Sequence, residues 1–289
     1  MKIVNCFILI LAAVCAAAVY ARADVRFRVR HTEGGRASEV VKYIKGKRQR
    51  DEFRGVRGRG GKLINTAFIR ECDRRRLLWL DETNKVYSVH QLDFRSNDEA
   101  FAYYAEQAAQ PDSPYAKVLE QARAQREKLP ATIIATTTVI DTGERREMFG
   151  YAARRIKTVT MWESAPAKAC PLEDARFETD GWYVDLLYGL DCSANISGQT
   201  ALASPPNAPL PPGRCGERIA KDKYRFESKL VGSARFGFPL LLTQAMFDGT
   251  RRTSVLTSEV LELSTEELSE SLFELPAGFR EIYVKQTKK

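Results

Sequence analysis

Few residues in this chain have the types and spacing that catalysis needs. The sequence holds only two histidines, His31 and His90, and neither lies in a Gly-x-Ser-x-Gly or His-Glu-x-x-His pattern. His90 falls in an expected strand, where a structural histidine is commoner than a general base. Three aspartates, Asp180, Asp185 and Asp191, surround one expected hairpin, where carboxylates are mostly solvated. We therefore predict no catalytic residues and a protein that is not an enzyme.

The glycine-rich stretch from Gly55 to Lys62 is similar to a phosphate-binding loop in composition only. Such a loop would need a glycine at Val56 and a serine or threonine at Leu63, because these residues carry the turn and the magnesium ligand. We interpret the stretch as a turn between strands. We predict no cofactor and no metal site.

Residues 1–23 have the pattern of a secretory signal. Lys2 supplies the positive charge, an apolar run extends from Ile3 to Val19, and Ala21-Arg22-Ala23 fits a small-x-small cleavage site,. We expect cleavage after Ala23 and export to the periplasm or the extracellular space. A retained membrane anchor and a lipid-modified Cys15 are the competing interpretations.

The remaining chain, residues 24–289, is expected to form a single globular domain. Hydrophobic residues make up 44% of the sequence, which is enough to bury a core,. The formal net charge is +8, and removal of the signal would lower it by two charges. A loop rich in proline, glycine and serine is expected at residues 193–214.

Four cysteines follow the signal, and an even number in an exported protein predicts two disulfides. A disulfide between Cys192 and Cys215 would close the proline-rich loop, whereas Cys170 and Cys192 flank a pair of expected strands, so the connectivity stays open. A zinc site is disfavoured because no Cys-x-x-Cys pair occurs. The candidates for disulfide bonds are Cys72, Cys170, Cys192 and Cys215.

Alternation of apolar and polar residues predicts strands over most of the chain. Turn residues are expected to join them at 81–84, 141–143, 180–181 and 248–249. Helical patterns occur in a pair of segments between Ser96 and Lys128 and after Ser264, which forms a capping box with Glu267. Strands follow strands in sequence, which indicates an α+β protein with predominantly antiparallel β-structure.

The strongest asymmetry in the sequence is its charge. Thirteen lysines and arginines lie between Arg26 and Lys62, against four acidic residues. A basic field of this kind attracts anions, and outside the cytoplasm these would be lipid headgroups or cell-envelope polymers rather than nucleic acid. A solvated face that keeps the protein soluble explains the pattern equally well. The predicted basic face contains Arg26, Arg28, Arg30, Lys45, Lys47 and Arg48.

Apolar residues recur at every second position in two later strands. Such rows could line the concave face of a curved sheet and hold an acyl chain, or they could simply form the core. Sequence does not separate these alternatives. The predicted cavity residues are Trp182, Val184, Leu186, Phe236, Phe238, Leu240 and Leu242.

Four segments together resemble bacterial exported proteins of the LolA-like lipoprotein-carrier superfamily. They are residues 69–87, with Asp81-Glu-Thr-Asn-Lys-Val-Tyr87, residues 141–151, residues 153–160 and the closing Ser271-Leu-Phe-Glu-Leu-Pro-Ala-Gly-Phe279. The resemblance implies a strongly curved sheet or half-barrel with a helical lid, formed by residues 96–128, over an apolar cavity. The four cysteines and the proline-rich loop depart from that family.

Two functions are therefore expected. The first is an exported binding protein that holds a lipid, a lipoprotein or an acyl chain in a half-barrel cavity. The alternative is a cell-envelope interaction protein that binds anionic polymers or headgroups through the basic face.

Overall fold

The structure is a computed structural model. It describes residues 24–57, 61–72, 74–91, 127–166, 175–186, 213–220, 224–233 and 236–282, together with single positions at 117, 120, 121, 124, 172, 210 and 211. The predicted signal segment lies outside the described residues, as does almost all of the predicted proline-rich loop.

The first part of the sheet is a meander of consecutive strands. In β1, Val25, Phe27 and Val29 are buried while the arginines between them are partly exposed, which is the period of a strand with one covered face,. The turn into β2 is formed by Gly34 and Gly35, whose φ angles of 56° and 78° suit a two-residue hairpin turn,. The strands are β1 (Val25–Glu33), β2 (Arg36–Lys45), β3 (Arg48–Arg57), β4 (Leu63–Glu71), β5 (Arg76–Asp81) and β6 (Val86–Gln91).

The second part is built from longer strands and holds one short helix, α4 (Gly213–Ala220). Its longest hairpin joins β7 to β8 through Phe149 and Gly150, both with positive φ. The strands are β7 (Thr132–Met148), β8 (Tyr151–Ala165), β9 (Arg176–Val184), β10 (Arg225–Val231), β11 (Phe238–Asp248) and β12 (Arg251–Ser264).

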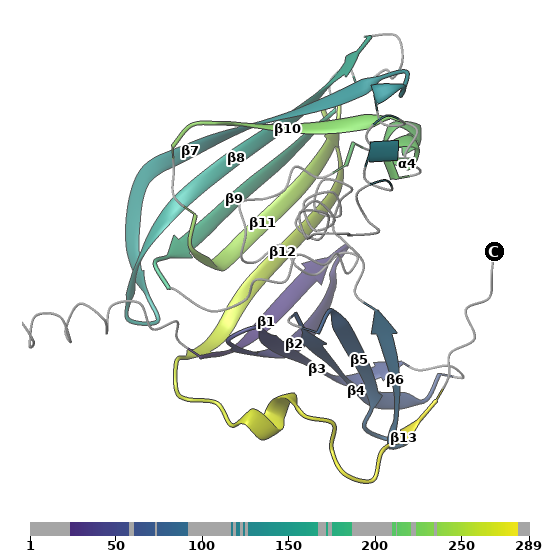
Figure 1. Cartoon of the computed structure of the whole chain (residues 1–289). Coiled ribbons are helices and arrows are strands. Elements are labelled where there is room, and N and C mark those ends of the chain that lie inside the picture. Colours follow the sequence, from purple (N-terminus) through teal and green to yellow (C-terminus); the bar gives the residue numbers. More distant parts are fainter. Residues whose placement is uncertain are drawn as a thin grey trace, which may run out of the picture.

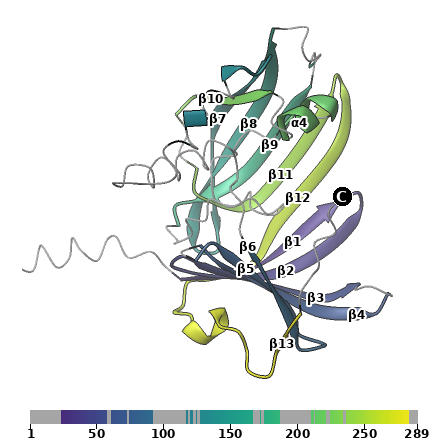
Figure 2. The same ribbon diagram turned by 45° about the vertical axis from the view of Figure 1, so that its right-hand side comes forward.

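All thirteen strands belong to one sheet, in the order β10-β7-β8-β9-β11-β12-β1-β2-β3-β4-β5-β6-β13. Its ladders are antiparallel except β10 with β7 and β13 with β6. Figures 1 and 2 show that β7 to β12 form a bowed upper part and β1 to β6 a lower part. The two parts are continuous through the β12–β1 ladder.

The end of the chain covers one face of the lower part. After β12 it runs through the 3-10 turn η3 (Glu270–Phe273) to β13 (Arg280–Glu281), beneath the lower strands in Figure 1. Leu268 and Phe273 pack there against Ile69, Leu78 and Leu80. Removal of these apolar side chains from water is what holds the segment on the sheet.

The predicted fold class is wrong. We expected an α+β protein with a helical lid, whereas the described residues are nearly all β-structure and form one large, mostly open sheet. No helical lid covers the sheet among the described residues, and most of the segment expected to form it, residues 96–128, lies outside them.

Candidate functional site

The predicted cavity residues lie on β9 and β11 and beside them, but they do not form one row. Phe238 and Leu240 pack in a buried cluster with Val184, whereas Leu242 packs in another with Tyr183. The register between β9 and β11 shifts between Pro239 and Leu241, and such a bulge interrupts the alternation of side chains. Among the seven, Trp182 and Phe236 are partly buried, and Val184, Leu186, Phe238, Leu240 and Leu242 are buried. Their role as a ligand cavity stays a prediction.

Cross-strand register brings Leu242 onto a face with polar residues. Leu242 lies opposite Gly181 on β9 and opposite Ser258 on β12, and Ser258 lies opposite His31 on β1. Residues directly opposite each other point to the same face of a sheet. We call this face the inner face, because Leu242, Ser258 and Thr158 on it are buried while Lys157 and Met161 on the other face are exposed.

Gly181 keeps this row close-packed. A Cβ at this position would lie 2.7 Å from Cε2 of Tyr183 and 3.0 Å from Cδ1 of Leu242. Any side chain there would push the Tyr183 ring or Leu242 out of place. Burial of Tyr183 raises the pKa of its hydroxyl above the ordinary value of 10.0.

The inner face carries a partly buried serine–histidine pair where the two parts of the sheet join. His31 Nδ1 lies 2.8 Å from Ser258 Oγ. His31 Nε2 is buried and has no hydrogen-bond partner among the residues that the structure describes. Burial, and secondarily the charge of Lys42, lowers the pKa of His31 below its ordinary value of 6.5, while Asp51 opposes this shift. The imidazole is therefore held neutral next to a hydroxyl.

A buried ion pair continues the polar region onto the lower part. Lys42 Nζ lies 3.0 Å from Asp51 Oδ2, and the two side chains are only 4% and 5% exposed. Gln49 donates to Asp51 Oδ1 at 2.6 Å and accepts from Arg70 Nη1 at 3.1 Å. Burial of charge costs free energy unless partners satisfy it, so these hydrogen bonds are needed to keep the pair inside.

Threonine hydroxyls continue the inner face into the upper part. Thr158 lies opposite Thr179 with an oxygen–oxygen distance of 2.7 Å, and Thr137 lies opposite Thr160 at 2.8 Å. All four side chains are buried. The inner face is thus a mixed surface of apolar clusters, paired hydroxyls and one buried charge network. The sequence did not lead us to predict its polar members. For Lys42, the pattern that could have indicated burial is its place between the apolar residues Val40 and Ile44 at alternate positions of the strand.

The predicted basic face is largely occupied by acidic partners. Arg28 and Arg30 share Glu39 at 3.1 and 2.8 Å, and Arg26 and Arg28 contact Glu262 at 3.7 and 2.6 Å. Pairing of this kind reduces the field available to an external anion.

The remaining cations of the predicted face lie at the turn between β2 and β3. Lys45 lies 3.2 Å from Asp24 and donates to the backbone oxygen of Leu268, and Arg48 pairs with Glu270 at 3.3 Å. Lys47 is exposed. The sequence order concealed this, because two of these four acidic partners, Glu262 and Glu270, come from the last thirty residues of the chain.

The aspartate cluster is also engaged in ion pairs. Arg155 binds Asp180 through two hydrogen bonds of 2.7 and 2.6 Å, and this lowers the pKa of Asp180 below its ordinary value. Arg154 holds Asp185 in the same way at 2.7 and 2.8 Å. Asp191 lies outside the described residues.

The two described cysteines lie in different parts of the molecule. Cys72 follows β4, and its amide donates to the Lys47 oxygen at 3.0 Å. Cys215 is buried in α4, against Ala131 and Trp162. Cys170 and Cys192 lie outside the described residues, so the connectivity stays a prediction.

Within the described ranges, histidine, cysteine, aspartate and glutamate form no group of three or more that could hold a metal ion. The same ranges contain no helix of the length and apolar character that a membrane crossing requires.

Comparison with known proteins gives no assignment. No family model and no curated protein matches the chain. An uncharacterized conserved protein from Thermus thermophilus shares 9% identity over 90% of this chain and 90% of its own, with a TM-score of 0.35. A LolA superfamily protein from Nitrosomonas europaea shares 8% identity over 88% of this chain and 90% of its own, with a TM-score of 0.27. PNGF-II shares 10% identity over 90% of this chain, which spans only 30% of that protein, with a TM-score of 0.32. One of these proteins is of the superfamily that the sequence resembles, but at these TM-scores and identities no argument about this chain rests on them.

Proposed function

We propose that this chain is an exported, non-catalytic binding protein that holds an amphiphile, with an acyl chain against the apolar part of the inner face. The predicted signal segment supports export to the periplasm or the extracellular space. The ion pairs that occupy Asp180 and Asp185 support a role other than catalysis. The sequence resemblance to the LolA-like superfamily favours the same class of ligand, a lipid or lipoprotein.

The observation that carries the proposal is the row Leu242–Ser258–His31 across β11, β12 and β1. On the side of Leu242 the face is apolar, with Tyr183, Ile156 and Val139 in one cluster. On the side of His31 it leads to the Lys42–Asp51 pair, because Lys42 lies opposite Phe27, on the same face of β1 as His31. An amphiphile needs an apolar lining that changes to polar groups at one end.

Neighbouring residues of β11 offer a matched test. Gln244 lies opposite Leu256 on the inner face, and Thr243 lies opposite Thr257 on the other face. Both positions are partly buried. Tryptophan introduced at either position would report contact with a ligand on one side of the sheet only, because successive side chains point to opposite faces.

The experiment measures quenching of tryptophan fluorescence by a brominated fatty acid. We expect the added fluorescence of Gln244→Trp to be quenched as the fatty acid is titrated, and that of Thr243→Trp to stay unquenched. Unsubstituted protein supplies the background from the native tryptophans. Equal quenching of both variants would indicate nonspecific adsorption, and no quenching of either would contradict the proposal.

We also propose that the four cysteines form two disulfides in the exported protein. The even number of cysteines after the predicted signal segment supports this, because disulfides form and persist in oxidising compartments,. Peptide mapping by mass spectrometry without reduction would give the connectivity. Four free thiols in protein isolated from an oxidising compartment would contradict it.

A further inference from the structure

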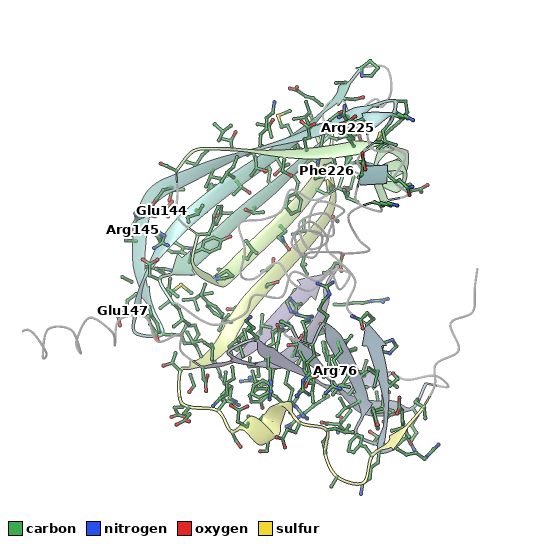
Figure 3. The ribbon with its side chains drawn as sticks, in the orientation of Figure 1. Arg76, Glu144, Arg145, Glu147, Arg225 and Phe226 are labelled. Carbon is green, nitrogen blue, oxygen red and sulfur yellow. The ribbon has the colours of Figure 1, made fainter. Side chains whose placement is uncertain are left out.

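Strand β10 is the terminal strand of the sheet at the end opposite to β13. Residues 227–231 are all exposed. Figure 3 labels Arg225 and Phe226 at the start of this strand, in the upper part of the sheet. Among the described residues, no strand pairs with its other edge.

The main chain of β10 has alternating hydrogen-bonding directions. The Arg225 amide donates to the Ala131 oxygen at 2.9 Å, and the parallel register of β10 with β7 is regular from Arg225 to Val231. With a period of two, Arg225, Glu227 and Lys229 face β7. The amides and carbonyls of Phe226, Ser228 and Leu230 consequently point to the free edge.

This edge lacks two of the features that normally prevent pairing, a bulge and a proline,. Terminal strands are commonly short, bulged, interrupted by proline or covered. Strand β6, at the other end, is covered in part by β13 through Arg280 and Glu281. In contrast, β10 has no register shift, and Leu230 and Val231 are 56% and 51% exposed.

The sequence of β10 is complementary to itself when two copies run antiparallel. The outward-facing groups define Ser228 as the centre of a twofold axis, because Phe226 would then exchange hydrogen bonds with Leu230 of the partner subunit. Glu227 would lie opposite Lys229 of the partner subunit, and the same pair would recur on the other side of the axis. Opposite residues that do not exchange backbone hydrogen bonds have the closer side chains, and opposite charges there favour pairing.

We propose that two copies of this chain associate through their β10 edges into a twofold-symmetric dimer with a continuous sheet. The same surface patch serves both subunits, as a twofold interface requires. The interface is small and consists of one strand from each subunit, so the dissociation constant is expected in the micromolar range, where interfaces of low area fall. This association goes beyond the proposed ligand binding and does not depend on it.

Charge reversal provides the test, by sedimentation velocity of the purified chain over a range of micromolar concentrations. We expect a monomer–dimer equilibrium for the unsubstituted chain. Lys229→Glu places two glutamates opposite each other and Glu227→Lys places two lysines, so each variant should weaken the dimer by about tenfold. An equal mixture of the two variants should restore a dimer, because every pair in the heterodimer is then of opposite charge.

Two further variants locate the interface. Ser228→Pro removes an amide that points to the free edge rather than to β7, and it should abolish association while the far-ultraviolet circular dichroism stays unchanged. Lys62→Glu makes the same charge change at an exposed position elsewhere and should leave the equilibrium as it was. A monomer at all concentrations, a dimer that survives Ser228→Pro, or variants whose mixture stays monomeric would each overturn the proposal. If the chain binds an extended peptide but does not self-associate, the partner of β10 is a peptide and not a second copy. That result would also overturn the proposal.

Discussion

The two parts of the sheet share one inner face, but the polar groups buried on it differ in charge between the two parts. In the lower part a fully buried ion pair, Lys42 with Asp51, lies within a hydrogen-bond network. In the upper part the buried polar groups are uncharged threonine pairs such as Thr158 with Thr179. The lower part is also covered on its outer face by the segment that holds Leu268 and Phe273, whereas partly exposed ion pairs such as Arg155 with Asp180 lie on the outer face of the upper part.

This difference indicates where the stability of the fold depends on the partners of buried polar groups. A buried charge needs its partner much more than a buried hydroxyl does, because the cost of taking an ion from water exceeds that of a neutral polar group. The lower part should therefore be intolerant of single changes at its polar residues and tolerant of paired ones. The upper part should respond in the same sense but more weakly.

The largest effect is expected from Asp51→Ala. It leaves the ammonium of Lys42 buried without its carboxylate, and the free energy of unfolding should fall by about 3–5 kcal/mol. Denaturation by urea measures this. The double variant Lys42→Met with Asp51→Leu should recover most of the loss, because neither charge of the pair is then buried. A double variant as unstable as the single one would show that the pair itself contributes the stability.

A smaller effect is expected from Thr158→Val. The change leaves the Thr179 hydroxyl buried without its partner, at a cost of roughly 1–3 kcal/mol. The double variant Thr158→Val with Thr179→Val should be nearly neutral by the same denaturation measurement. If Thr158→Val costs as much as Asp51→Ala, the distinction between the two parts is wrong.

Hairpin turns of the two parts allow a direct comparison of backbone strain. Phe149 in the upper part and Lys85 in the lower part both have a φ of 52°, a conformation that costs most residues about 1 kcal/mol and that asparagine tolerates. Phe149→Asn and Lys85→Asn should each raise the melting temperature slightly. A lower melting temperature for Phe149→Asn alone would mean that its exposed ring stabilises the hairpin by packing.

The smallest effect concerns pH at the junction of the two parts. The pKa of His31 is lowered in the folded chain, so the unfolded chain binds more protons just below the ordinary value of 6.5. Stability contributed by the neutral imidazole is therefore present above pH 6.5 and is lost as pH falls through the folded pKa. Chemical denaturation at a series of pH values should detect this slope, and His31→Gln should reduce it.

Several features of the fold followed from local sequence. Alternating residues predicted the strand at Val25–Arg30, which is part of β1, and the turns at 81–84 and 248–249 lie between strands as expected. At two other places the turns predicted from turn-forming residues are wrong. Asp180-Gly181 lies inside β9, where Gly181 is needed for close packing. Asp141-Thr-Gly143 makes a register irregularity inside the β7–β8 hairpin, whose turn is at Phe149 and Gly150.

The capping box at Ser264 and Glu267 also failed as a helix signal. The chain continues without a helix to η3, which Ser269 caps. Burial of Leu268 and Phe273 against the sheet stabilises the chain more than the local helix preference does, because a short helix gains little stability from propensity alone.

By itself the sequence determined that this chain forms strands, where most of them lie, and that the Gly-x-Ser-x-Gly and His-Glu-x-x-His motifs do not occur in it. These properties depend on residue type and on spacing within a few positions. Only the tertiary structure decided that the strands make one sheet, that a bulge at Pro239 to Leu241 divides the apolar row, and that acidic residues from the end of the chain pair with the basic face. The physical reason is that register and ion pairing join residues more than two hundred positions apart, such as Arg28 and Glu262, and no local pattern encodes such a contact.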